Sequence, residues 1–192
     1  MERKAPASGK PERLRRAFAP VLAAASLVLA PPAAAAPAVL TITQNTALRF
    51  GAFVVISSGS RTVGANGAVT NVSVFPVGSA PVGPAQFTVT YDRGNNNQKP
   101  IDIVFEVILP GVSPVSQAGV TGRLSAFDSD LAGAMVLVPG RAYQYTLANC
   151  VTRTCSKTFK VGAKLDVTRS SGGAVLTIGL PMVANLILVN KL

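Results

Sequence analysis

One segment of the chain alternates strictly between apolar and other residues, and this pattern limits the fold more than any other feature of the sequence. The segment spans residues 158–168, and its apolar members are Phe159, Val161, Ala163, Leu165 and Val167. A period of two over eleven residues places every apolar side chain on one face of a β-strand, whereas an amphipathic helix needs a period near 3.6. The segment is therefore predicted to be a strand with one buried face.

Similar segments follow one another along the chain after residue 38, and none there has a sustained helical period with helix caps. Hairpin turns are predicted at Asn66-Gly67 and at residues 170–173, where turn residues separate two β-like runs. We therefore expect an all-β protein, an antiparallel β-sandwich of the immunoglobulin or pilin type with about eight to ten strands. The clearest predicted strands are residues 48–57, 69–77, 86–91, 101–109, 142–148, 158–168, 174–180 and 183–189.

The first 36 residues (1–36) have the composition of an export signal. Six basic residues precede an uncharged run of 14 residues at 17–30, and alanines follow. This order is typical of a secretory signal peptide, and the run is too short to cross about 30 Å of hydrocarbon. We expect cleavage near residues 35–38, a single β-sandwich domain over residues 37–192, and no transmembrane segment in the mature chain. A membrane anchor is the alternative, and Arg15-Arg16 leaves twin-arginine export open beside the general secretory route.

The strong positive charge of the chain belongs partly to this leader. The whole sequence carries a net charge of +10, and removal of residues 1–36 takes away six basic and two acidic residues and leaves +6. A nucleic-acid-binding domain usually carries a dense stripe of lysine and arginine, which the remaining sequence lacks. We therefore expect no nucleic-acid partner.

The two cysteines, Cys150 and Cys155, are predicted to form one disulfide. An even number of cysteines in an exported chain favours a disulfide, and the four residues between them can close a tight loop between two strands. A metal site and a redox pair are the alternatives. The C-x4-C spacing differs from the C-x-x-C of redox proteins, and no histidine or second cysteine pair completes a tetrahedral zinc site.

The inventory of reactive residues is poor. Histidine is absent, which excludes Ser-His-Asp and Cys-His catalysis as well as histidine-ligated metals. Asp102 and Glu106 share one face of a predicted strand, about 13 Å apart, and are interpreted as solvent-facing charges rather than the paired acids of a glycosidase. Asp128-Ser129-Asp130 lacks the glycine and distal glutamate of a calcium loop and is interpreted as a turn. We expect no catalytic residue, no metal, no cofactor and no enzymatic activity.

Two groups of surface-type residues leave a binding role open. Basic residues near the disulfide are interpreted as a solvated strand face, or alternatively as a contact for an anionic surface or polysaccharide. The three tyrosines would give a stacking platform for a glycan if they were exposed, but their alternation with polar residues favours burial in the core. The basic residues are Arg153, Lys157, Lys160 and Lys164, and the tyrosines are Tyr91, Tyr143 and Tyr145.

Short motifs in the chain resemble a bacterial secreted family known as domain of unknown function 4402. A Phe-Gly pair opens an early strand, an A-x-F-x-V strand follows later, and a late strand resembles V-G-G-x-L, with Ala163 in place of the second glycine. The resemblance covers most of residues 40–190 and implies no activity. The Phe-Gly opening is also similar, more weakly, to pilin-type and spore-coat-U-type sandwich subunits. The residues that carry the motifs are Phe50, Gly51, Phe53, Phe87, Val89 and Gly162.

These features favour a non-enzymatic protein of the cell envelope or surface, exported to the periplasm, the outer surface or the medium. The leading hypothesis is a structural or adhesive, fimbria-like subunit. Its apolar segments at residues 39–43 and 186–189 would pair with the sheet edge of a neighbouring copy or with another envelope component. Pairing of these segments within their own domain is the alternative. The second functional hypothesis is a module that binds an envelope polysaccharide or protein.

Overall fold

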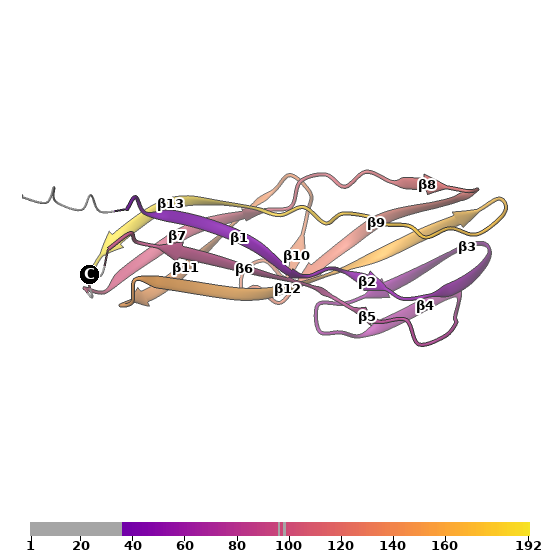
Figure 1. Cartoon of the computed structure of the whole chain (residues 1–192), viewed down its shortest axis with the longest axis horizontal. Coiled ribbons are helices and arrows are strands. Elements are labelled where there is room, and N and C mark those ends of the chain that lie inside the picture. Colours follow the sequence, from indigo (N-terminus) through magenta and orange to yellow (C-terminus); the bar gives the residue numbers. More distant parts are fainter. Residues whose placement is uncertain (1–35, 96, 98) are drawn as a thin grey trace, which may run out of the picture. The chain divides into compact units, whose positions relative to one another are not determined.

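The computed structural model describes residues 36–95, 97 and 99–192, and these residues contain strands and no helix (Figure 1). The predicted signal peptide over residues 1–36 lies outside them except for Ala36. No described helix is long and apolar enough to cross a membrane. The described strands are β1 (Val39–Thr46), β2 (Arg49–Phe50), β3 (Phe53–Val63), β4 (Val69–Pro76), β5 (Val82–Gly83), β6 (Ala85–Asp92), β7 (Ile101–Ile108), β8 (Val115–Gln117), β9 (Val120–Ser129), β10 (Val136–Leu137), β11 (Ala142–Cys150), β12 (Thr154–Arg169) and β13 (Val183–Lys191).

The long strand β12 lies at the centre of the largest of the three sheets. Its first half pairs with β6, which in turn pairs with β1, whereas its second half lies between β3 and β9. Strand β4 pairs with the other side of β3, and the short strands β8 and β10 pair with β9. Every one of these pairings is antiparallel. Residues 158–168, the clearest predicted strand, thus lie within the strand that holds the sheet together.

The second sheet has three strands in the order β11-β7-β13, and it covers the first half of β12. Residues from both sheets share one hydrophobic core, so the two sheets pack face to face as a sandwich. Phe87 and Phe159 lie opposite each other in register with ring centroids 5.8 Å apart, and fully buried Phe105 joins their cluster from β7. The prediction of an all-β antiparallel sandwich is confirmed.

The predicted alternation of apolar side chains is followed without interruption by burial in strands β6 and β7. Buried and half-buried residues alternate along the full length of both strands. Nine of the described strands have eight residues or more, which agrees with the eight to ten expected. The turn predicted at Asn66-Gly67 joins β3 to β4, which pair as a hairpin. Residues 39–43 lie in β1 and residues 186–189 in β13, and each of these strands pairs within its own domain.

Two predictions about strands are wrong. Residues 174–180 form no strand. Leu176, Ile178 and Leu180 face inward, but the segment has no ladder partner among the described residues, and residues 170–173 therefore make no hairpin. The strand predicted over residues 48–57 is broken at Gly51-Ala52 into β2 and β3. Gly51 has φ +69°, and a Cβ there would lie 2.6 Å from Cγ2 of Val82, so the chain turns where only glycine fits.

Strand β9 was not predicted, although it is one of the longest strands. Its register against β12 shifts between Gly162 and Lys164, where the β9 strand carries an extra residue. Ala126 lies at this β-bulge with φ +47°. A bulge moves the following side chains to the opposite face, and it therefore interrupts the period of two on which sequence analysis depends.

Candidate functional site

The second half of β12 is covered by irregular chain rather than by a sheet, and a cleft lies beneath that cover. The cleft has a volume of about 730 Å³. Its floor consists of core-facing residues of the large sheet, and its two walls are residues 47–53 and residues 172–178. We call it the apolar cleft. The floor residues are Val55, Val120, Leu165 and Val167.

The first wall of the apolar cleft is built by the Phe-Gly motif. Phe50 belongs to a two-stranded ribbon in which Arg49 lies opposite Gly83 and Phe50 opposite Val82. The tight turn at Gly51 then returns the chain into β3, so that Phe53 joins the cleft lining beside the floor. Phe50, Gly51 and Phe53, which carry the motif in the sequence, therefore lie together at one site.

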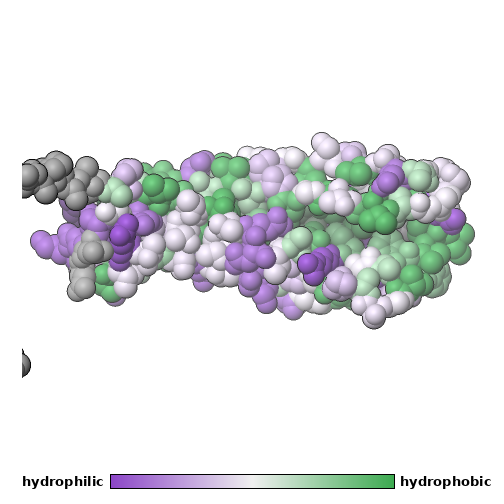
Figure 2. Space-filling model, viewed as in Figure 1, coloured by the Kyte–Doolittle hydropathy of each residue, from purple (hydrophilic) through white to green (hydrophobic). Residues whose placement is uncertain are grey.

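The second wall is an extended segment whose backbone joins none of the described sheets. Leu176 and Ile178 point toward the large sheet, and Cδ1 of Leu176 lies 2.8 Å from the position that a Cβ on Gly122 would occupy. The glycine in β9 thus gives the segment room to approach. Val175, on the outward side, is 85% exposed. Figure 2 shows hydrophobic residues gathered over the part of the molecule that carries β2, β3 and β4 in Figure 1.

The charged residues that line the apolar cleft are two arginines, and none of the described acidic residues lines it. Arg169 donates hydrogen bonds from Nε to the carbonyl oxygen of Gly172 over 2.7 Å and from Nη1 to that of Val55 over 3.3 Å, and so ties the second wall to β3. Arg49 is exposed and forms no ion pair with any described residue.

A third arginine lies behind the first wall. Arg61 is 5% exposed, and its guanidinium carbon lies 5.8 Å from the centroid of the Phe53 ring. Its Nε and Nη1 atoms have no hydrogen-bond partner among the described residues. A buried cation without a counter-ion raises the positive potential of its surroundings, because the interior screens charge weakly. The region of the apolar cleft is therefore electropositive as well as apolar.

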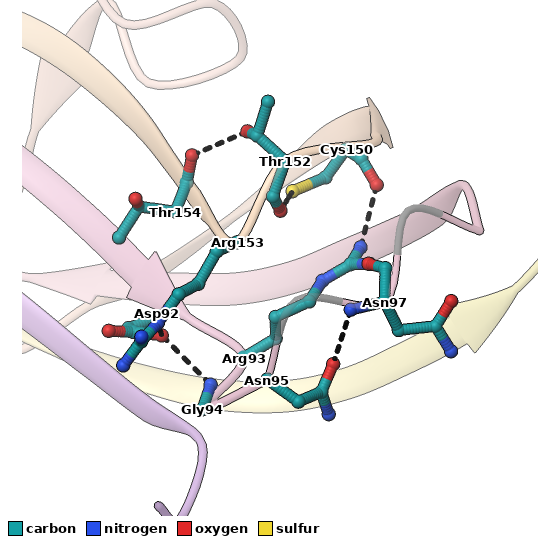
Figure 3. A network of polar contacts seen from close by, with 9 residues as sticks. All are labelled: Asp92, Arg93, Gly94, Asn95, Asn97, Cys150, Thr152, Arg153 and Thr154. Atoms are coloured by element: carbon teal, nitrogen blue, oxygen red, sulfur yellow. Dashed lines mark hydrogen bonds and ion pairs between the residues drawn. The ribbon is translucent and has the colours of Figure 1, made fainter.

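The predicted disulfide between Cys150 and Cys155 is confirmed, with the two Cα atoms 6.1 Å apart. The bridge joins strands of two different sheets. The cysteines do not pin a hairpin, because β11 belongs to the three-stranded sheet and β12 to the large one. The bridge closes the connection by which the chain passes from one layer of the sandwich to the other. We call the surrounding residues, 92–95, 97 and 150–154, the disulfide end of the domain (Figure 3).

The remaining residues singled out in the sequence pack the core or hold loops in place. Phe87 and Val89 are buried in β6, and Gly162 lies in β12, where a Cβ would meet the backbone oxygen of Val63 at an impossibly short distance. Asp128 accepts a hydrogen bond from the Ala65 amide over 2.9 Å, and Asp130 accepts one from the Lys160 amide over 2.6 Å. These carboxylates hold loops and turns in place.

The tyrosines and the basic residues considered for a binding surface do not gather at one site. Tyr91 and Tyr143 are buried, as their alternation indicates, and the half-buried Tyr145 lies under the Lys157 ammonium at 5.5 Å from its ring centroid. The remaining basic residues are partly paired: Lys164 with Asp166 over 2.9 Å and Arg153 with Asp92 over 3.1 Å. Because two of the three tyrosines are buried, the tyrosines do not form an exposed stacking platform. Within the described residues, no group of three or more metal-ligating side chains occurs.

Comparison with known proteins agrees with the motifs. The family model described as Domain of unknown function (DUF4402) matches residues 40–177, which is most of the chain. The chain belongs to this family. The matched range runs from β1 to the second wall of the apolar cleft and includes Phe50, Gly51 and Gly162. No curated protein and no solved structure gives a match, so the weaker similarity to pilin-type subunits stays a prediction.

The apolar cleft as a whole has no signature in the sequence. Its parts come from separate segments, and of the two arginines that line it, Arg49 stands directly before the Phe-Gly motif and Arg169 belongs to no motif. Two signals of its walls were available: the Phe-Gly motif at Phe50-Gly51, which belongs to the first wall, and the run of residues 174–180, which resembles a strand but is followed by Pro181 and preceded by glycines. Neither indicated that residues 174–180 lack a strand partner.

Proposed function

We propose that this DUF4402 protein is an exported, non-enzymatic structural or adhesive subunit of the cell envelope or surface, and that its copies associate by adding strand to strand. The partner to which the proposal commits is a second copy of the chain. The observation that carries the proposal is the character of the edge strand β13, which is apolar, exposed and free of charge over residues 183–189.

Strand β13 lies at the edge of the three-stranded sheet, where it pairs with β7 on one side. Exposed edge strands are usually protected by lysine, proline or a strong bulge, because free N–H and C=O groups recruit other chains. In β13 the exposed side chains include Leu186, Ile187 and Leu188, and Leu188 is 50% exposed. The register against β7 shifts between Leu186 and Leu188, and the one lysine, Lys191, stands at the last position of the strand. An edge with this composition supports pairing with another β-strand.

A second uncharged edge lies in the other sheet. Strand β4 ends the path β1-β6-β12-β3-β4, and it contains no charged residue, with its one proline, Pro76, at the last position. Its Phe75 lies opposite Val54 of β3, and both side chains are about half exposed. Two different apolar edges on one chain allow a head-to-tail contact, in which β13 of one copy meets β4 of the next. Such a heterologous contact gives rings or open fibres rather than closed dimers.

The experiment is sedimentation velocity of the protein expressed from its full-length sequence, over a wide range of concentrations. We expect species larger than a monomer that grow with concentration. The variant Ile187→Lys places a charge on the edge and should shift the population back to monomer, whereas Met135→Lys, at a residue that is 72% exposed outside both edges, should leave it unchanged. A protein that stays monomeric at every concentration would refute the proposal.

A further inference from the structure

We infer that the apolar cleft is a binding site for a small amphipathic anion, a single alkyl chain that ends in a carboxylate. This inference is independent of the proposed assembly, because the edges β13 and β4 do not supply the cleft lining. The volume of about 730 Å³ lies within the range of roughly 300–1,000 Å³ that is usual for small-molecule sites.

The interior of the apolar cleft suits an alkyl chain. Its floor is made of buried valine and leucine side chains, and Phe50 and Phe53 stand on one wall opposite Leu176 and Ile178. Each methylene group that leaves water for such a surface contributes about 0.8 kcal/mol. The described lining residues include no acidic side chain and no cluster of polar groups that would hold a sugar or a peptide side chain by specific hydrogen bonds.

The charge of the apolar cleft selects the head group. Arg49 and Arg169 are its charged lining residues, and Arg49 has no ion-pair partner among the residues described. Arg61 adds a buried positive charge behind Phe53. A carboxylate at the rim would gain a charge-assisted hydrogen bond from Arg49, whose planar guanidinium matches a carboxylate, while the alkyl chain lies over Leu165 and Val167.

An extended peptide is the competing occupant, because residues 173–182 offer backbone groups that none of the described sheets uses. The arginines favour the anion. An uncharged apolar strand gains nothing from two cations at the rim and a third behind the wall, whereas an alkyl carboxylate uses the apolar floor and the positive charge together. The peptide is therefore an outcome that the experiment must distinguish.

The test is calorimetric titration of the protein, expressed from its full-length sequence, with dodecanoate below its micellar concentration. Dodecanol and dodecyltrimethylammonium have the same chain with a neutral and a cationic head. We expect dodecanoate to bind at one site per chain, at least about tenfold more tightly than the cationic amphiphile. Arg49→Gln should weaken dodecanoate binding by roughly fivefold, because the ion pair is exposed to solvent. The matched control Lys191→Gln removes the same charge from an exposed residue of β13 and should change nothing.

A second pair of variants tests the location. Ala174→Trp places an indole on a wall of the apolar cleft and should abolish binding, whereas Ala132→Trp, at an exposed residue outside the lining, should not. The inference is overturned if dodecanoate fails to bind, if the head group makes no difference, or if Arg49→Gln binds like the wild type. It is also overturned if a synthetic β13 peptide binds and is blocked by Ala174→Trp while dodecanoate has no effect, or if the protein binds dodecanoate-containing vesicles but no monomeric dodecanoate.

Discussion

The Nη2 atom of Arg93 donates a hydrogen bond over 2.8 Å to the backbone carbonyl oxygen of Cys150 (Figure 3). This contact joins the end of β6 in the large sheet to the end of β11 in the other sheet. The Nη1 atom of the same guanidinium donates to the carbonyl oxygens of Asn97 and Lys99, so one buried side chain ties three segments together. Arg93 is 7% exposed.

Replacement of Arg93 should therefore destabilise the disulfide end of the domain. Arg93→Gln leaves the buried carbonyl oxygen of Cys150 without this donor, and Arg93→Lys keeps the charge but cannot reproduce the planar fork. We expect each variant to lower the free energy of unfolding by about 2–3 kcal/mol, as measured by urea denaturation. Arg141→Gln, a replacement of an exposed arginine elsewhere, is the control and should cost much less. A lysine variant as stable as the wild type would show that the fork is dispensable.

The disulfide should contribute a modest amount of stability. Its loop contains six residues counted from Cys150 to Cys155, and loop-closure entropy for a loop of this size gives about 2 kcal/mol. The double variant Cys150→Ala/Cys155→Ala should fold and lose about that much in urea denaturation, and a reductant should lower the stability of the wild type by a similar amount without affecting the variant. If the reduced wild type kept its full stability, the bridge would have no structural role.

The strands that could be predicted are those in which alternation is unbroken. In β7, Ile103, Phe105 and Val107 are buried, and the residues between them are half-buried, so the period of two determined both the strand and its inner face. The bulge at Ala126 hid β9, because one extra residue exchanges the faces. In residues 174–180, Leu176 and Ile178 also point inward, but an alternating pattern carries no information on whether a neighbouring strand exists.

The apolar cleft could not be predicted for a related reason. It arises where the layer over β12 is incomplete, and that is a property of three chain segments that meet only in the folded domain. The Phe-Gly motif at Phe50-Gly51 lies in one wall of the cleft, where the positive φ of Gly51 favours glycine. Nothing near Arg169 in the sequence indicated that its side chain bridges the other wall to Val55.

Asp166 should make stability depend on pH in the acid range. Burial raises the pKa of this carboxyl, but hydrogen bonds from Ser125 and Lys164 outweigh that effect and hold the pKa below its ordinary value. The group therefore stabilises the fold above the unfolded pKa of about 3.9, and this contribution disappears as the pH falls through the lower folded pKa. We expect Asp166→Asn to be less stable than the wild type at pH 7, with a gap that closes below about pH 4. A gap that stays constant between about pH 7 and about pH 2 would contradict this account.

Gly162, a residue of the family motif, should not tolerate even a methyl group. A Cβ at this position would clash with the backbone oxygen of Val63 and lie 2.5 Å from the amide nitrogen of Ala65, and backbone atoms cannot move aside as a flexible side chain can. Gly162→Ala should therefore cost about 1–3 kcal/mol in urea denaturation, the usual cost of overpacking. Gly173→Ala is the matched control, because a Cβ on Gly173 would have no atom within 4 Å and the φ of this residue is not positive. That substitution should be neutral or slightly stabilising, since it reduces the conformational freedom of the unfolded chain. Equal stability of the two variants would show that β12 and the turn after β3 can separate at little cost, and that Gly162 serves another purpose than close packing.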